Sequence, residues 1–419
     1  MRSLPTFWLM CSWLAAGGAA QSDLPVVWLR ELTGELLRAN PDVRAARFRY
    51  EASLKRPSQV STLPEPKFTF TDFGVGHPMS RLSVSDFAYL AFGVSQEMPY
   101  PGKLALAGEE AHKQAESEGQ AWRAAILEKT TELKVVYYDW FYLSKAIEIT
   151  KKNRDVLGQF EKISRARYSV GKGIQQDILR AQVERSAIEQ QLATLDQQRS
   201  SVEAKINSLV KRLPDQLLGQ PSEVHRTDFS MDLERLLDLV SQNAPRLRAR
   251  QFEVDSHAVG IERAKKDYRP DFNFSFQWQK TAAMFPDYYM ATAEVRLPVF
   301  FWRKQRFAAE EASSRLAESR ENYQATRQEL LFEAKDEYLK IRTSERLLAL
   351  YESGILPQSS LALESAMTGY QVGNIDFLTL LNNQTAVLTY QMQYYEQLAK
   401  HEQALARLEP LAAMELTKP

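Results

Sequence analysis

Carboxylates that could form acid–base pairs are the first candidates for chemistry in this sequence. Adjacent acids occur at Glu109-Glu110 and again at Glu310-Glu311, and general acid–base catalysis commonly relies on such side chains. Both pairs lie in long, highly charged stretches, so solvated helix faces explain them better than an active site. The sequence also has no glycine-rich phosphate loop, no His-Glu-x-x-His pair and no nucleophile elbow. We therefore expect neither an enzyme nor a cofactor.

Thiol and metal chemistry find equally little support. The only cysteine is Cys11, which lies in a segment that we expect to be removed, so disulfides and cysteine-based zinc sites are excluded. The five histidines are scattered along the chain, and we expect no metal site. The 53 basic residues balance the 53 acidic ones. This balance argues against a nucleic-acid binder that works by overall charge.

Two similar turns carry the most specific residue pattern. The first runs Tyr168-Ser169-Val170-Gly171-Lys172-Gly173, and the second runs Tyr370-Gln371-Val372-Gly373-Asn374. Gly171 and Gly373 can adopt the positive φ that reverses a helix, or can simply cap it. Asp177 and Asp376 lie just beyond the turns, at equivalent ends of the second helices, where they could cap the next helix.

The turns belong to an internal repeat of about half the chain. Tyr168 to Gly171 recurs 202 residues later, and Pro66-Lys67-Phe68-Thr69-Phe70 resembles Pro270-Asp271-Phe272-Asn273-Phe274 at an offset of 204. Landmarks in the same order at a nearly constant offset indicate duplication. We expect a first repeat over 21–213, an equatorial linker over 214–243, a second repeat over 244–412 and a tail over 413–419.

Each repeat should contain a helix, two strands, a very long helix, a tight turn and a second long helix. The first helices are expected over 41–62 and 245–268, and the hairpins over about 102–213 and 303–410. A helix over about 102–168 would span roughly 100 Å at 1.5 Å per residue. After the first turn, apolar residues step by four and three, which is typical of a coiled-coil seam. The seam consists of Ile188, Leu192, Leu195, Arg199, Val202, Ile206, Leu209 and Leu213.

The strands are expected at about 66–76, 87–97, 270–280 and 288–297. In the third strand, Phe272, Phe274, Phe276 and Trp278 alternate with neutral polar residues. Segments of this length and alternation suit a transmembrane β-barrel, although a soluble sandwich with one wet face is the alternative. Four strands cannot close a barrel, since the smallest have about eight. A membrane location therefore requires a barrel shared between chains.

The N-terminus predicts export. Residues 1–20 combine Arg2, an apolar stretch and the small residues Gly18-Ala19-Ala20, which is typical of a secretory signal peptide. The alternatives are lipidation at Cys11 and a hydrophobic first helix of a cytosolic protein.

The whole layout resembles the TolC-like outer-membrane efflux protein family. Residues 96–103 (Gln-Glu-Met-Pro-Tyr-Pro-Gly-Lys), 168–173 and 177–182 (Asp-Ile-Leu-Arg-Ala-Gln) resemble in particular its heavy-metal and cation efflux branch. The resemblance implies a mainly α fold with a small β part and an internal duplication. It also implies long antiparallel helical hairpins that form an α-barrel tunnel, and four strands per chain in a shared trimeric transmembrane β-barrel.

The same resemblance implies function and partners. The homotrimer would be a passive exit duct in the outer membrane of a Gram-negative bacterium, in contact with its lipid and extending through the periplasm. An inner-membrane pump, of the resistance-nodulation-division type, and a periplasmic adaptor (membrane fusion) protein would complete a tripartite efflux system, with metal cations as cargo. A periplasmic coiled-coil adaptor and a structural stalk remain the alternatives.

The resemblance also assigns roles at the turns. The adaptor-docking residues would be those of the two tips, and three-fold symmetry would turn the two aspartates into rings of carboxylates at an aperture, with two arginines as lock partners. The docking set is Tyr168, Val170, Gly171, Lys172, Gly173, Tyr370, Val372, Gly373 and Asn374, and the aperture set is Asp177, Asp376, Arg167 and Arg180.

Overall fold

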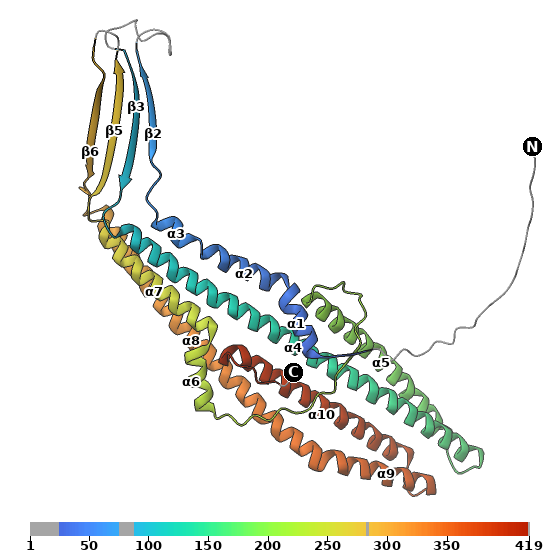
Figure 1. Cartoon of the computed structure of the whole chain (residues 1–419). Helices are drawn as coiled ribbons and strands as arrows, with labels where there is room; N and C mark the ends of the chain where they lie inside the picture. Colours follow the sequence, from blue (N-terminus) through green and yellow to red (C-terminus); the bar gives the residue numbers. More distant parts are fainter. Residues whose placement is uncertain (1–24, 75–87, 282–284, 418–419) are drawn as a thin grey trace, which may run out of the picture.

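The computed structural model describes residues 25–74, 88–281 and 285–417. The expected signal peptide over 1–20, including Cys11, lies outside these residues. Figure 1 shows an elongated molecule in which a four-stranded sheet stands at one end of a layer of long helices. The helices run from the base of the sheet to two hairpin tips at the opposite end. The fold therefore separates an apolar sheet from the tips by the length of the helical layer.

The sheet joins the two repeats. Its strands are β2 (Lys67–Phe73), β3 (Tyr89–Met98), β5 (Asp271–Thr281) and β6 (Tyr288–Arg296), and they pair antiparallel in the order β2-β3-β5-β6. The edges of the sheet are thus the first strand of one repeat and the last strand of the other. Their outward backbone groups have no strand partner among the described residues.

One face of the sheet is apolar and open. Phe70, Phe92, Trp278 and Tyr289 lie in one cross-strand row, and the rings of Phe70 and Phe92 are 5.2 Å apart. Phe92 is 53% exposed even though its neighbours are aromatic. The opposite face is polar at its base, where Glu97 and Arg296 form an ion pair of 2.8 Å. The predicted alternation of apolar and polar residues therefore places apolar side chains on one face of the sheet and polar side chains on the other.

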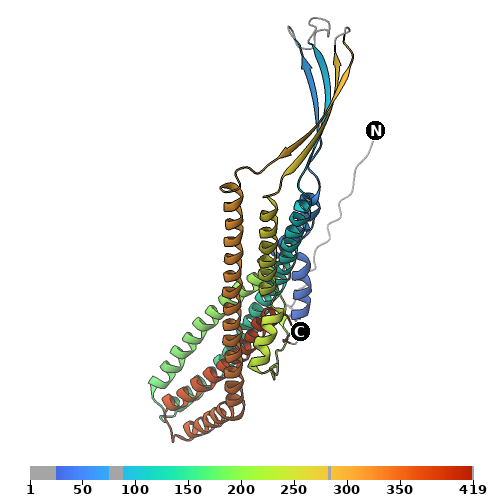
Figure 2. The same cartoon turned by 90° about the vertical axis from the view of Figure 1, so that its left-hand side faces the viewer.

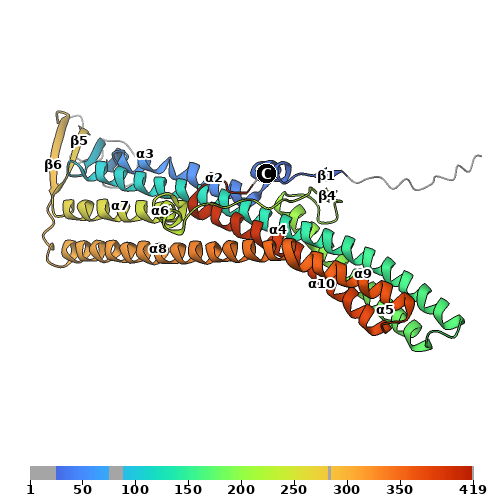
Figure 3. The same ribbon diagram turned by 90° about the horizontal axis from the view of Figure 1, so that it is seen from below.

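The helices form two long hairpins. In the first, α4 (Lys103–Ser169) has 67 residues, about 100 Å at 1.5 Å per residue, and returns as α5 (Gln175–Leu209). In the second, α8 (Lys304–Leu350) continues through a π-helical turn into α9 (Leu356–Val372), and α10 (Phe377–Ala412) returns. Figures 2 and 3 show the two hairpins side by side. No helix among the described ranges is both long and apolar enough to cross a membrane.

Prolines interrupt two helices that the sequence predicted as continuous. The helix expected over 41–62 is split into α2 (Pro41–Ser53) and α3 (Arg56–Ser61), because Pro57 has no N–H to donate to the carbonyl four residues earlier. Pro357 has the same effect in the second repeat. There the π-helical turn η1 (Tyr351–Ile355) accommodates the missing bond without breaking the rod. The counterpart of the first helix, α7 (Pro245–Lys266), is unbroken.

The predicted seam of α5 packs as expected except at its end. Ile188, Leu192 and Ile206 are buried, whereas Leu213 is 77% exposed. Leu213 was expected in the seam, but α5 ends at Leu209 and Lys211 adopts a φ of 62° that turns the chain away.

A collar surrounds the middle of the helices. It contains α1 (Leu29–Ala39), α6 (Leu233–Asn243) and a short parallel pair of β1 (Val26–Val27) with β4 (Gln220–Pro221). Its core includes the fully buried Trp140 and Tyr137 of α4. The aromatic cluster at residues 137–142 is thus packing for the collar.

The C-terminal tail is held by a buried ion pair. Lys134 Nζ lies 2.6 Å from Glu409 Oε2 and donates to Thr417 Oγ1 at 2.8 Å. The other carboxylate oxygen of Glu409 accepts the backbone N–H groups of Leu416 and Thr417. Removing either charge would leave its partner buried and unpaired, which would destabilise the folded chain.

A buried histidine fixes the linker between the repeats. His401 Nε2 donates to the Thr227 carbonyl at 2.8 Å, and its Nδ1 lies 3.0 Å from Ser344 Oγ. Glu402 accepts from the Thr227 backbone N–H at 2.7 Å. Burial lowers the pKa of His401, with Glu345 and Arg226 as the nearby charges. The imidazole is therefore neutral in the folded chain.

We predict that acid destabilises the collar through His401. Because its folded pKa is lowered, the stabilisation by the neutral ring is complete above the ordinary pKa of about 6.5 and is lost as the pH falls below it. The thermal unfolding midpoint, measured by circular dichroism in detergent, should fall between about pH 7.5 and about pH 5.5. His401→Gln should flatten this dependence, and the exposed His225→Gln should not. An equal slope in His401→Gln would contradict the assignment.

Candidate functional site at the hairpin tips

The two tips lie next to each other at the end farthest from the sheet (Figure 1). Both reverse by a glycine with positive φ, 72° at Gly171 and 86° at Gly373. In the first turn the N–H of Lys172 donates to the carbonyl of Arg167 at 2.9 Å, and in the second the N–H of Asn374 donates to the carbonyl of Gly369 at 2.8 Å. Two equivalent bonds thus close two equivalent turns.

Tyr370 joins the two tips. Its side chain is only 2% exposed, and its hydroxyl donates to Asp177 Oδ2 at 3.2 Å while Ser164 Oγ lies 3.0 Å away. Its ring packs against Phe377 with centroids 5.6 Å apart. Burial raises the pKa of Tyr370, so the hydroxyl keeps its proton and remains a donor.

Arg167 completes the contact from the first hairpin. Its guanidinium lies 4.5 Å from the centre of the Tyr370 ring and donates to the Tyr370 carbonyl. It also donates to the Lys172 carbonyl at 3.2 Å. One cation therefore stacks on the aromatic ring and satisfies one carbonyl at the end of α9 and one in the turn that follows α4.

A second contact lies farther up the hairpins. The Gln384 amide of α10 donates to the Asn153 side chain of α4, and both residues are buried. The repeat-equivalent Gln182 instead donates to Glu161 at 3.1 Å within its own hairpin. The two equivalent glutamines therefore make different contacts: Gln384 links the two hairpins, and Gln182 links the two helices of the first hairpin.

The two aspartates also differ. Asp376 caps α10, accepting the Thr379 N–H at 2.7 Å, and this bond lowers its pKa. Asp177 does not cap α5, because Ile174 occupies the N-cap position. Capping therefore accounts for Asp376 and leaves Asp177 free to bind Tyr370.

Seven of the nine expected docking residues are exposed, and Tyr370 and Gly173 are not. Tyr370 was expected among the docking residues, but it is buried because its ring fills the space between the hairpins. Arg180, expected as a lock partner, is exposed and makes no hydrogen bond or ion pair with the described residues of its own chain. Gly173 is partly buried, and a Cβ added there would lie 3.2 Å from the Cβ of Arg167. The exposed members of the docking set are Tyr168, Val170, Gly171, Lys172, Val372, Gly373 and Asn374.

Sequence reasoning missed Ser164 and Phe377. Ser164 lies three residues before Arg167, on the same helix face, so helical periodicity could have included it. Phe377 begins α10 directly after Asp376. Only the fold shows that both meet Tyr370.

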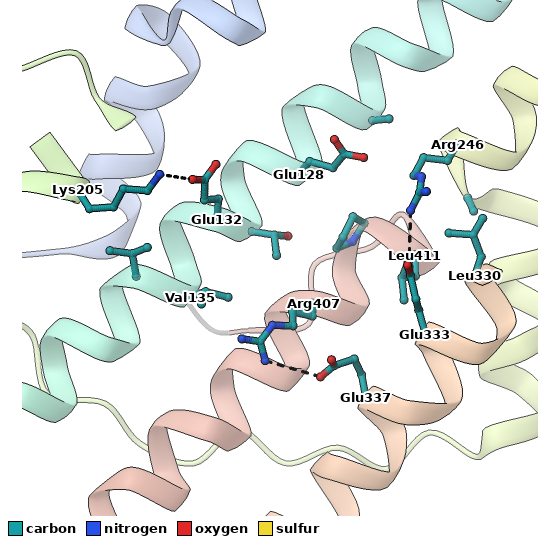
Figure 4. A pocket seen from close by; sticks show the side chains of 15 residues that line it. Glu128, Glu132, Val135, Lys205, Arg246, Leu330, Glu333, Glu337, Arg407 and Leu411 are labelled. Atoms are coloured by element: carbon teal, nitrogen blue, oxygen red, sulfur yellow. Dashed lines mark ion pairs between the residues drawn. The ribbon is translucent and has the colours of Figure 1, made fainter. Parts of the chain in front are cut away.

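A cavity of about 540 Å³ lies at the collar between α4, α8 and α10 (Figure 4). Six of its charged side chains form ion pairs: Lys205 with Glu132 at 2.6 Å, Arg246 with Glu333 at 3.6 Å and Arg407 with Glu337 at 3.9 Å. Glu128 also lines the cavity and forms no ion pair with the described residues. Burial raises the pKa of Glu333. No group of three metal-ligating side chains occurs in residues 25–74, 88–281 and 285–417.

Comparison with known families shows which family has this architecture. A sequence model described as outer membrane efflux protein matches residues 32–210 and 236–413. The chain belongs to the outer membrane efflux protein family. The two matched segments are the two repeats. This is a non-enzymatic family of outer-membrane efflux channels that form trimers in tripartite systems and have a periplasmic helical tunnel. The adaptor and stalk interpretations are therefore set aside.

Solved structures of outer-membrane channels share the fold. VceC from Vibrio cholerae is 18% identical with a TM-score of 0.78, and the match covers 93% of this chain and 96% of that one. CusC is 13% identical with a TM-score of 0.78 and 95% coverage of both chains. MtrE of Neisseria gonorrhoeae, described in an open state, is 16% identical with a TM-score of 0.77 and coverage of 93% and 89%. No curated protein matches this sequence.

We predict opposite effects of one substitution at two glycines of this efflux protein. Gly373→Ala should destabilise the tip by about 1 kcal/mol, because an L-residue is strained at positive φ and its Cβ would lie 3.4 Å from Arg167 Nη2. Gly158→Ala, inside α4 with open space around it, should stabilise by up to about 1 kcal/mol. Limited proteolysis at the tip checks both. Equal protease resistance of the two variants would contradict the strain argument.

Proposed function

We propose that three copies of this chain form one exit duct, with a shared barrel in the outer membrane and a helical tunnel below it. The observation that carries the proposal is the four-stranded sheet, whose exposed aromatic face suits lipid and whose edge strands β2 and β6 lack partners in the described chain. Lipid offers no hydrogen bonds to such edges. Pairing β6 of one copy with β2 of the next would satisfy them.

The size of the barrel favours a trimer. Two copies would supply eight strands and three would supply twelve, and both numbers can close. The polar face, with its Glu97–Arg296 pair, would then line a lumen that a small barrel would fill with side chains and a larger one would fill with water. Because a conducting lumen must hold water, the larger barrel made by three copies is favoured.

The cargo and the partners form a separate part of the proposal. Residues 96–103, 168–173 and 177–182 resemble the heavy-metal and cation efflux branch, so we propose metal cations delivered by a resistance-nodulation-division pump through a periplasmic adaptor. The duct need not bind the metal itself. Loss of metal resistance, but not of detergent or dye resistance, on deletion of the gene tests this cargo.

We further propose that Tyr370 closes the tip at rest. Its hydroxyl holds Asp177 and Ser164 of the first hairpin, while Arg167 holds its ring. Opening an aperture requires the hairpins to separate, and these contacts oppose that movement. The tip bonds are fewer and more exposed than those of the collar, so separating the hairpins at the tip requires less free energy than opening the collar.

Tyr370→Phe should therefore open the duct. The variant keeps the packed ring but loses the hydroxyl bonds to Asp177 and Ser164, and about 1 kcal/mol per bond shifts a closed–open equilibrium severalfold. Single-channel conductance in planar bilayers should rise or show longer openings. Tyr168→Phe, at the exposed equivalent position, is the control. Unchanged conductance in Tyr370→Phe would remove the lock.

The tip valines are proposed as adaptor contacts. Val170 and Val372 are 66% and 67% exposed at equivalent positions of the two turns, and exposed apolar side chains at a tip are suited to a helical partner. Val170→Asp with Val372→Asp should abolish efflux and adaptor cross-linking while leaving the trimer intact. Leu361→Asp, at another exposed apolar residue, is the control. Efflux that persists in the double variant would refute docking at these valines.

A further inference from the structure

The corner between β6 and α8 presents an aromatic surface to solvent. Val299, Phe300, Phe301 and Trp302 are each between 50% and 65% exposed. The rings contact one another, with Phe301 and Trp302 centroids 5.3 Å apart. Backbone bonds define the turn, because the N–H groups of Arg303 and Lys304 both donate to the Phe300 carbonyl. Exposed aromatic rings held on a hydrogen-bonded turn indicate a binding surface.

Cations without partners lie beside these rings. Arg269 precedes β5 and Arg303 and Lys304 follow β6, so all three lie at the base of the sheet. They are exposed, and within the described parts of the chain none of their side chains makes a hydrogen bond or ion pair. Arg306, one turn farther, is paired with Glu310 at 2.9 Å. Three exposed cations without partners therefore lie at the level of the corner.

The equivalent corner of the first repeat is closed. Lys103 Nζ lies 2.9 Å from Asp271 and 3.3 Å from Asp267. The Tyr100 N–H also donates to Asp271 at 2.8 Å, and Lys266 lies over the Tyr100 ring. Aromatic and basic residues occur at both corners, but only the second repeat leaves them available.

We propose that the second-repeat corner, Val299–Lys304 with Arg269, binds the anionic phospholipid headgroups of the periplasmic membrane surface. The inference rests on the proposed barrel. The apolar face of the sheet continues through Val295 and Leu297, both more than half exposed, so lipid that covers this face reaches the corner. Aromatic rings favour the headgroup level of a bilayer, and unpaired Arg and Lys at that level attract anionic lipid.

The charges also decide between possible occupants. An apolar protein partner would leave three cations unsatisfied, and a soluble acidic partner would leave the rings exposed. A surface of anionic headgroups above acyl chains satisfies both groups at once. Because α8 begins at Lys304, binding here would also fix the angle between sheet and tunnel.

The test uses the full-length trimer in nanodiscs of equal parts phosphatidylglycerol and phosphatidylcholine. Lipid retained after detergent washing is quantified by mass spectrometry. The wild type should enrich phosphatidylglycerol about fivefold or more, the effect expected of a single headgroup–cation contact. Arg269→Gln/Arg303→Gln/Lys304→Gln should return the ratio to that of the bulk lipid. The matched control, Lys151→Gln/Lys162→Gln/Arg320→Gln, removes three exposed, unpaired cations of α4 and α8 and should keep the enrichment.

The outcomes distinguish failure of the lipid-binding proposal from failure of the proposed function. A wild type that does not enter bilayers as a trimer refutes the proposed function. A trimer that inserts but shows no enrichment, or keeps it in the corner variant, refutes the inference and leaves the duct standing. If the corner variant fails to assemble, high salt on the wild type replaces it, since screening should abolish enrichment. Salt-insensitive enrichment would overturn the proposal.

Discussion

The constraint on which the rest of this structure depends is the need to pair every backbone group of a sheet that faces lipid. Four strands with an exposed aromatic face have two open edges, and hydrocarbon provides no partner for their N–H and C=O groups. Sealing the edges requires other copies of the chain. The sheet order β2-β3-β5-β6 puts the two repeats side by side, so each copy adds one continuous segment of wall. The helices attached at its base then follow the same ring, which turns a closed sheet into a tunnel.

The duplicated chain is most informative where its repeats differ. Tyr168 and Tyr370 occupy equivalent turns, yet the first is 49% exposed and the second 2%, because the Tyr370 ring packs against Phe377 and Arg167. The corners below the sheet differ in the same way, with Lys103 paired to Asp271 in one repeat and Arg303 unpaired in the other. Duplication supplies two copies of a motif, and packing within one subunit allows each copy a separate task. The second repeat thus provides the buried Tyr370 and the open corner, and the first repeat provides the residues that hold Tyr370.

Much of this architecture could be predicted from the sequence because it is periodic. Alternation of apolar residues predicts the strands, and proline-free stretches predict helices as long as α4. The misses have local or long-range causes. Pro57 and Pro357 act on carbonyls four residues away. Pro57 divides a helix into two, and Pro357 places a π-helical turn in a rod that stays continuous. Leu213 continued the seam in spacing but fell beyond the turn at Lys211. The contact between Arg167 and Tyr370 joins positions 203 residues apart, and no single sequence can reveal such a pair.

The distribution of polar contacts argues that movement is confined to the tip side of the collar. In the collar, the Lys134–Glu409 pair and the His401 bond to Thr227 are buried, and breaking them would expose unsatisfied groups to an apolar interior. At the tip, the Asp177 and Arg167 side chains that hold Tyr370 are only partly buried, so water can replace the lost bonds. The π-helical turn at 351–355 lies between these regions, and such turns already have weakened i→i−4 bonding. A rod that is rigid through the collar and softened at one turn transmits strain at the tip into rotation of α9 rather than into unfolding of the core.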